Sequence, residues 1–246
     1  MAKQTGYSEK DTDFVFPKKF ECPMCGGSFK NMTLKTGKAR MIGSDDDLRP
    51  IHEGIDTVKY DVVLCPSCGY GTIARNFGPV TQVQKKYYKE YEGPIFFSGG
   101  IDSESVLSYQ GALDRYKQAL CCSYAKQGPD SEKAYLCLKI AWLLRGWRQT
   151  LGEKKPNTRA ALEEKEKEFL MRARDGFKAA NLKESYPLCG MDELTVDYLV
   201  AALNITFGEY DEASKLISGI IARGGRSRIK ERAHDLKDKI AELKAE

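Results

Sequence analysis

Two cysteine motifs of the same form constrain this chain more than any other feature. The first is Cys-Pro-Met-Cys-Gly at residues 22–26, and the second is Cys-Pro-Ser-Cys-Gly at residues 65–69. In each motif we expect the backbone to turn back so that both sulfurs face one ion. Two motifs supply four thiolates, which is the tetrahedral ligand set of structural Zn²⁺ sites. The sequence therefore predicts one structural zinc ion. Its predicted ligands are Cys22, Cys25, Cys65 and Cys68.

The spacing of these ligands leaves the kind of metal open. The 39 residues between the two pairs exceed the usual gap of a zinc ribbon, although strands and a loop can fill it. An iron–sulfur cluster is the alternative, since four cysteines also hold such clusters. Because four thiolates leave no coordination position for water or substrate, we expect a structural metal and no catalytic one. His52 lies between the pairs as a fifth candidate ligand, but a lone histidine in a loop is more often a surface or packing residue.

The composition argues for a cytoplasmic protein without a membrane segment. The first 20 residues have charges throughout and do not form a signal peptide. No apolar run approaches the roughly 20 residues that span a bilayer. Thiols stay reduced in the cytoplasm, so the eight cysteines are expected as ligands and buried thiols. The net charge of +4 is too small to argue for nucleic acid.

The first 80 residues are predicted to form a small β-rich unit. Residues 57–65 alternate in the period-2 pattern of a strand. We expect residues 38–42 to form its partner strand and residues 43–54 to form a loop. The three aspartates at 45–47 lack the alternation of a calcium loop and are predicted to form a solvated turn. The strand residues expected on one face are Val58, Tyr60, Val62 and Leu64.

Residues 81–102 are predicted to link this unit to the remaining chain. Lysines and tyrosines interleave over residues 84–93, which predicts an amphipathic helix with its tyrosines on the core. The alternative is that these residues stack on single-stranded nucleic acid and pair with its phosphates.

Residues 103–246 are predicted to form a stack of about six antiparallel helices, which makes the fold α+β and mostly α. Gly208, Tyr210 and Ala213 follow the pattern of a tetratricopeptide repeat, in which glycine permits a tight turn between two helices. The predicted helices cover residues 102–127, 130–147, 158–183, two segments of 190–221 joined at Gly208, and 227–244.

The helix before Gly208 is apolar on two sides, which predicts burial between neighbouring helices. One side carries Leu194, Tyr198, Ala201 and Ile205. The other side carries Val196, Val200, Leu203 and Phe207.

The stretch Ser-Gly-Gly-Ile-Asp-Ser at residues 98–103 resembles the phosphate-binding loop of ATP pyrophosphatases. In those enzymes the loop follows a strand of a parallel α/β sheet, which needs further strands between helices. Nothing after residue 103 has a strand pattern. We therefore interpret the stretch as a glycine turn that caps a helix, with an ATP-using enzyme as a lesser hypothesis. The other cysteines lack metal spacing and are predicted in or near the core: Cys121, Cys122, Cys137 and Cys189.

The order of these motifs resembles a bacterial family catalogued as domain of unknown function 2225. The resemblance lies in "ECPMCGGSF", "RPIHEGIDTVKYDVVLCPSCGYGTIARNF" and "GMDELTVDYLVAALNITFGEYDEASKLISGII", and it covers roughly residues 17–240. It implies a zinc-ribbon-like N-terminal part and tetratricopeptide-like helices. It also implies metal ligation by the same four cysteines, argues against ligation by His52, and carries no established activity.

Together these observations predict a non-enzymatic interaction protein. Its zinc-stabilised β-rich unit would accompany a helical domain that binds another protein, because helical stacks offer extended binding surfaces. The alternative is a nucleic-acid-associated module in which the zinc unit and the Lys/Tyr stretch grip RNA or DNA.

Overall fold

The structure is a computed structural model that describes residues 11–91, 106–153, 155–223 and 227–245. The predicted glycine turn at residues 98–103 lies outside these ranges. The described residues confirm the α+β, mostly α fold. They contain seven α-helices: α1 (Gln82–Glu90), α2 (Tyr109–Ala125), α3 (Asp130–Thr150), α4 (Pro156–Lys183), α5 (Glu193–Thr206), α6 (Tyr210–Ala222) and α7 (Arg228–Ala245).

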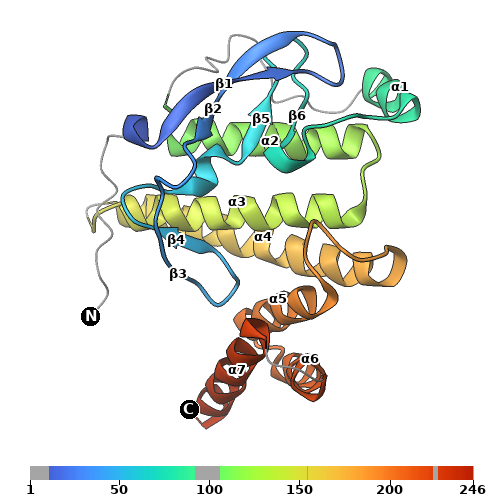
Figure 1. The fold of residues 1–246 in the computed structure, drawn as a ribbon. Helices are drawn as coiled ribbons and strands as arrows, with labels where there is room; N and C mark the ends of the chain where they lie inside the picture. The colour runs from blue at the N-terminus through green and yellow to red at the C-terminus, as the bar shows by residue number, and fades with distance from the viewer. Residues whose placement is uncertain (1–10, 92–105, 154, 224–226, 246) are drawn as a thin grey trace.

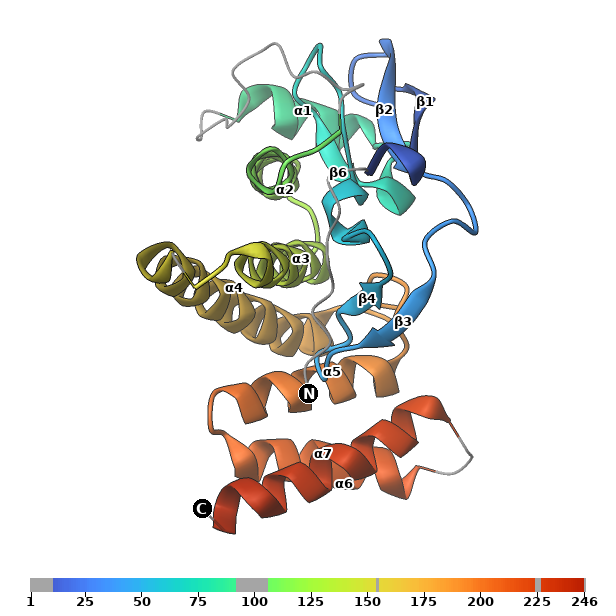
Figure 2. The same cartoon turned by 90° about the vertical axis from the view of Figure 1, so that its left-hand side faces the viewer.

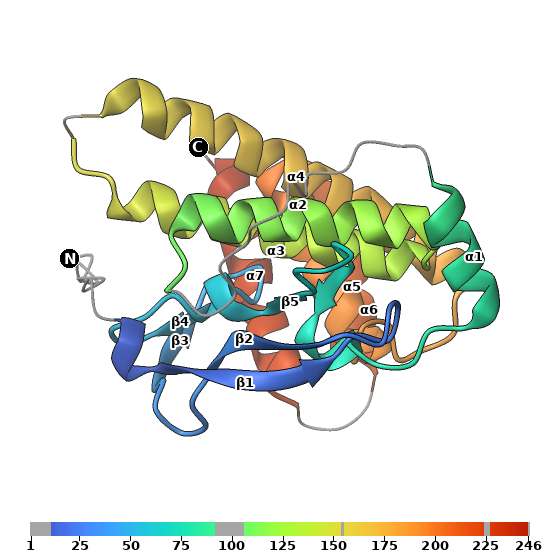
Figure 3. The same cartoon turned by 90° about the horizontal axis from the view of Figure 1, so that it is seen from above.

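The helices stack in order along the length of the molecule (Figure 1). α2, α3 and α4 form the middle of the stack, and α5, α6 and α7 form one end. Figure 2 shows that the strands lie along one side of this stack. Seen from above, the first two strands run beside α2, and α1 lies next to the far end of α2 (Figure 3).

The described strands form three antiparallel hairpins, each a two-stranded sheet. The first hairpin was not predicted, and it carries the first cysteine motif at its turn. The strands are β1 (Val15–Glu21) with β2 (Ser28–Leu34), β3 (Met41–Ser44) with β4 (Pro50–His52), and β5 (Val62–Leu64) with β6 (Gly71–Ile73).

Two predictions about the strands were wrong. The strand expected from residue 57 begins only at Val62, because Thr57–Tyr60 is a 3-10 helix that Asp56 caps by accepting the Val58 N–H at 3.1 Å. Residues 38–42 do not pair with that strand. Met41 pairs with His52 instead, so the expected loop at 43–54 is largely the β3–β4 hairpin.

The aspartates at the tip of this hairpin form a turn, but the prediction that they are solvated was wrong. Asp47 is buried and Asp45 is half-buried, because both carboxylates bind the guanidinium of Arg145 from α3 at 2.7 Å. The same guanidinium also binds Glu166 of α4 at 2.6 Å. Asp46 is exposed and pairs with Lys239 of α7 at 2.6 Å. The hairpin therefore has charged contacts with α3 and α7, and Arg145 extends this network to α4.

The helical predictions agree with the structure in number and position after residue 106. α2 begins later than expected, because the Ser108 hydroxyl accepts the Gly111 N–H and caps it. Gly208 joins α5 to α6 with a φ of +76°, a conformation that glycine adopts at little cost. The two apolar sides predicted for α5 pack into two different clusters, so α5 is buried between its neighbours.

One hydrophobic cluster joins the strands to the helices. It contains Val15, Ile55 and Val62 from the first 80 residues, together with side chains of α2, α3, α4 and α5. Tyr116 of α2 is fully buried in it and donates a hydrogen bond to the Val58 carbonyl at 2.8 Å. Residues on both sides of the predicted boundary at residue 80 thus share one core.

We expect replacement of Arg145 by methionine to lower the free energy of unfolding by about 3–5 kcal/mol, because it leaves the buried carboxylate of Asp47 without the guanidinium of Arg145 and leaves Glu166 with Arg148 alone. Lys239→Met is the matched control. It removes an exposed ion pair to the same hairpin and is expected to cost less than about 1 kcal/mol. Urea unfolding followed by circular dichroism measures both, and equal costs would contradict the role of Arg145.

Candidate metal centre

The structure brings the four predicted cysteines together. Their sulfur atoms all lie within 4.8 Å of one another. The Cys22 and Cys68 sulfurs are 3.6 Å apart, and those of Cys25 and Cys65 are 3.8 Å apart. A tetrahedral Zn²⁺ site with metal–sulfur bonds of about 2.3 Å requires sulfur–sulfur distances of about 3.8 Å. The four residues therefore fit a single tetrahedral ion.

Both cysteine motifs reach this geometry through the same backbone turn. In the first, the Gly26 N–H donates to the Cys22 carbonyl at 2.8 Å, and in the second the Gly69 N–H donates to the Cys65 carbonyl at 3.0 Å. Gly26 and Gly69 have φ angles of +76° and +71°, which strain other residues. The glycine of each motif thus allows the turn that aims both sulfurs at one point.

The site lies at the edge of the protein. Cys22 and Cys65 are buried, whereas Cys68 is half-buried and Cys25 is exposed. Solvent therefore approaches from the Cys25 side, and the hydrophobic contacts lie behind the other sulfurs.

The thiols of the site have different pKa values, because they contact one another and are buried to different degrees. The contact with the Cys68 thiol, whose sulfur is 3.6 Å away, lowers the pKa of Cys22 to about 5. The same contact, followed by burial, raises the pKa of Cys68, and burial raises the pKa of Cys65. One thiolate thus forms readily, whereas further thiolates need a cation to offset their repulsion.

Helix α2 holds the second motif in place. The Gln118 side chain donates to the Gly69 carbonyl at 2.9 Å. The Cys122 thiol donates to the same carbonyl at 3.4 Å and accepts from the Gly71 N–H at 3.3 Å. Cys122 is thus buried, as the sequence predicted, and its contacts orient the backbone behind the four cysteines, which the sequence did not indicate.

Helix α1 supports the site from the other side. The Tyr88 hydroxyl donates to the Cys68 carbonyl at 3.1 Å, and its ring packs edge-on against Tyr70. Tyr70 contacts Phe77, which in turn contacts Phe20 and Phe29 of the first hairpin. Tyr88 therefore packs on the protein, as predicted for a tyrosine of the linking segment.

His52 does not lie in this site. Its Nδ1 atom is 3.1 Å from the Thr57 hydroxyl, and burial lowers the pKa of its imidazole. Within the described ranges, the four cysteines are the one group of three or more side chains placed to hold a metal ion. Of the remaining cysteines, Cys137 is buried in the core, and Cys121 and Cys189 are half-buried.

The family model described as uncharacterised protein conserved in bacteria, DUF2225, matches residues 15–243. The chain belongs to this family. The match confirms the resemblance inferred from the cysteine motifs and the helical hairpin. No curated protein and no solved structure matches the chain. Among the described residues of this DUF2225 protein, no helix is both long enough and apolar enough to cross a membrane.

Sequence reasoning found the cysteines of the site and missed the residues that support them. Gln118 and Cys122 lie about 50 positions after the second motif and have no spacing that relates them to it. The amphipathic pattern of residues 84–93 predicted that their tyrosines pack on the core, and it thereby indicated the contact made by Tyr88.

We expect Gly26→Ala to lower the free energy of unfolding by about 1–2 kcal/mol, because its φ of +76° disfavours any side chain. The space around Gly26 is open, so this cost comes from the backbone alone. Gly27→Ala is the neighbouring control, since an added Cβ would lie 3.5 Å from the Cys25 sulfur, an ordinary contact. Urea unfolding of the metal-loaded protein compares the two, and a larger cost at Gly27 would contradict this account.

Proposed function

We propose that this protein is a zinc-binding, non-enzymatic scaffold of the cytoplasm that binds another protein through its helices. The observation that carries the proposal is the convergence of four cysteine sulfurs within 4.8 Å, with no fifth protein ligand placed beside them in the described ranges. Such a closed set of thiolates suits a metal that stabilises structure. Reduced thiols of this kind persist in the cytoplasm.

Sulfur spacing supports zinc over an iron–sulfur cluster. A cluster places several irons and inorganic sulfides between the cysteine sulfurs, which moves them apart. Contacts of 3.6 and 3.8 Å leave room for one ion. Because tetrahedral coordination by four thiolates has no open position, the ion would not activate water or substrate.

The partner surface is proposed on helices α2 and α4. Three of their large apolar side chains are exposed, with Tyr124 of α2 at 52%, Met171 of α4 at 46% and Leu182 of α4 at 86%. The ion pair between Asp130 and Lys183 joins the start of α3 to the end of α4, and Lys133, which also pairs with Asp130, lies over the Tyr124 ring. An extended helical surface with exposed aromatic and aliphatic side chains is the kind that proteins bind.

We expect the purified protein to contain one zinc ion per chain and Cys25→Ser to lose most of it, because an exposed ligand of the site is removed. Cys121→Ser is the matched control and should retain zinc, since Cys121 lies outside the cluster. Elemental analysis measures the metal, and visible absorbance reveals any iron–sulfur cluster. A chain with iron and sulfide, or zinc unaffected by Cys25→Ser, would overturn the zinc assignment.

We expect nuclease-treated bacterial lysate to yield one protein in stoichiometric amount with the wild-type chain. A double variant, Tyr124→Asp with Met171→Asp, should lose that protein, because a charge on each position disrupts an apolar contact. Val83→Asp is the control, since Val83 is also exposed, at 58%, but lies on α1. Equal recovery by all three chains would refute this surface, and the absence of any protein partner would refute the scaffold function.

A further inference from the structure

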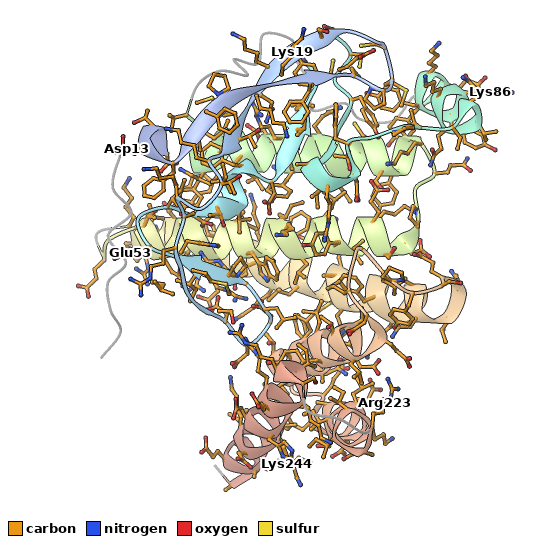
Figure 4. The ribbon with its side chains drawn as sticks, in the orientation of Figure 1. Asp13, Lys19, Glu53, Lys86, Arg223 and Lys244 are labelled. Carbon is orange, nitrogen blue, oxygen red and sulfur yellow. The ribbon has the colours of Figure 1, made fainter. Side chains whose placement is uncertain are left out.

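The four sulfurs of the metal centre differ in their access to solvent. Cys25 is exposed, whereas the other three cysteines are buried or half-buried. The centre lies between the first hairpin and α1, at the end of the molecule where Lys19 and Lys86 point outward (Figure 4). A small solute therefore reaches the Cys25 sulfur first.

The Cys25 sulfur meets the conditions for reversible oxidation. Metal ligation keeps a cysteine as its thiolate, and the thiolate is the form that oxidants attack. Susceptibility follows thiolate character and exposure, and the oxidation is reversible where a second thiol lies beside the first. The Cys65 sulfur lies 3.8 Å from that of Cys25 and belongs to the other motif. A disulfide between them would therefore join the two motifs, as a bound metal does.

Both motifs are also held by contacts that do not involve the cysteine sulfurs of the site. In the first hairpin, Arg115 of α2 donates to the side-chain oxygen of Asn31 at 2.7 Å, and both residues are buried. The second motif is held by Gln118 and Cys122 of α2, which both donate to the Gly69 carbonyl. Because α2 positions both halves of the site, these halves would remain neighbours when the ion is lost.

We propose that the metal centre releases its ion in response to peroxide, through oxidation of Cys25 and Cys65 to a disulfide. Cys22 and Cys68 are then the remaining thiolates, and two thiolates hold a metal ion far more weakly than four. The disulfide replaces the metal as the crosslink between the motifs, so the N-terminal part stays folded while the metal site is lost. This inference rests on the zinc site of the proposed function and adds its regulation.

The oxidation consumes one molecule of hydrogen peroxide. The Cys25 thiolate attacks one peroxide oxygen, so that an S–O bond forms, the O–O bond breaks and hydroxide leaves. The Cys65 thiolate then attacks the sulfur of the Cys25 sulfenic acid, which forms the S–S bond and releases a second hydroxide. The two sulfurs lose two electrons, the peroxide oxygens gain them, and two protons from solvent convert the hydroxides to water. A thiol reductant reverses the reaction by thiol–disulfide exchange.

The test treats the zinc-loaded full chain with hydrogen peroxide. A chromogenic indicator follows released zinc, and a thiol reagent follows the remaining free thiols. One zinc ion and two thiols should be lost per chain, and peptide mapping by mass spectrometry should find Cys25 joined to Cys65. A thiol reductant with added zinc should restore the original state.

Two histidine variants separate the roles of the sulfurs. Cys25→His and Cys68→His each keep four ligands, because histidine replaces one cysteine in many zinc sites. Cys25→His lacks the exposed thiolate and should retain its zinc under the same peroxide treatment. Cys68→His keeps the pair Cys25 and Cys65 and should release zinc as the wild type does. Equal release from both variants would overturn the proposal, and the mapping of the wild type decides the pairing where a variant does not load zinc.

Thermal melts test whether the disulfide replaces the metal as a crosslink. Cys25 and Cys65 are 40 positions apart, and a crosslink over such a separation disfavours the unfolded chain. The oxidised chain should therefore melt at a higher temperature than reduced chain freed of zinc by a chelator. An equal or lower melting temperature, or a disulfide that leaves Cys25 free, would contradict the proposal. Zinc retained in peroxide would refute it and leave the zinc assignment standing, whereas a chain purified without zinc would refute both.

Discussion

The N-terminal part of this protein depends on placing four cysteine sulfurs within 4.8 Å of one another. Without a cation, that arrangement brings four thiols together at the edge of the protein, and a divalent metal bound there would crosslink the two motifs. The two glycine turns aim the sulfurs at one point. Contacts from Gln118 and Cys122 of α2 and from Tyr88 of α1 hold the backbone of the second motif in place. Short hairpins of this size are marginal alone and gain stability from such a crosslink and from packing on a helix.

A second set of charged contacts positions the hairpin β3–β4 against the helices. Arg145 binds Asp45, Asp47 and Glu166 at once. Burial lowers the pKa of its guanidinium, but the carboxylates of Asp47 and Glu166 raise this pKa by more. The pKa therefore lies above its ordinary value, and Arg145 remains charged. Because these partners come from the hairpin and from α4, the network holds the tip of the hairpin at one position beside α3 and α4. The Lys239–Asp46 pair is exposed and adds little to stability.

These two sets of contacts tie different strands to the helices. The cysteine cluster is held against α1 and α2, and the β3–β4 hairpin is held against α3 and α7. The proposed scaffold function uses the exposed apolar side chains of α2 and α4, which take part in neither set of contacts.

The sequence by itself determined which four cysteines cluster, the helices after residue 106 and the two buried sides of α5, because these follow from short-range spacing and periodicity. It misplaced the start of β5, the partner of residues 38–42 and the environment of Asp45 and Asp47. Those features depend on contacts over long separations, such as Arg145 with Asp47 or Cys122 with Gly69. A local sequence pattern indicates how polar a residue is. Only the tertiary structure decides whether a partner distant in the sequence offsets the free-energy cost of burying that residue, because an ion pair or hydrogen bond requires both partners to be in place.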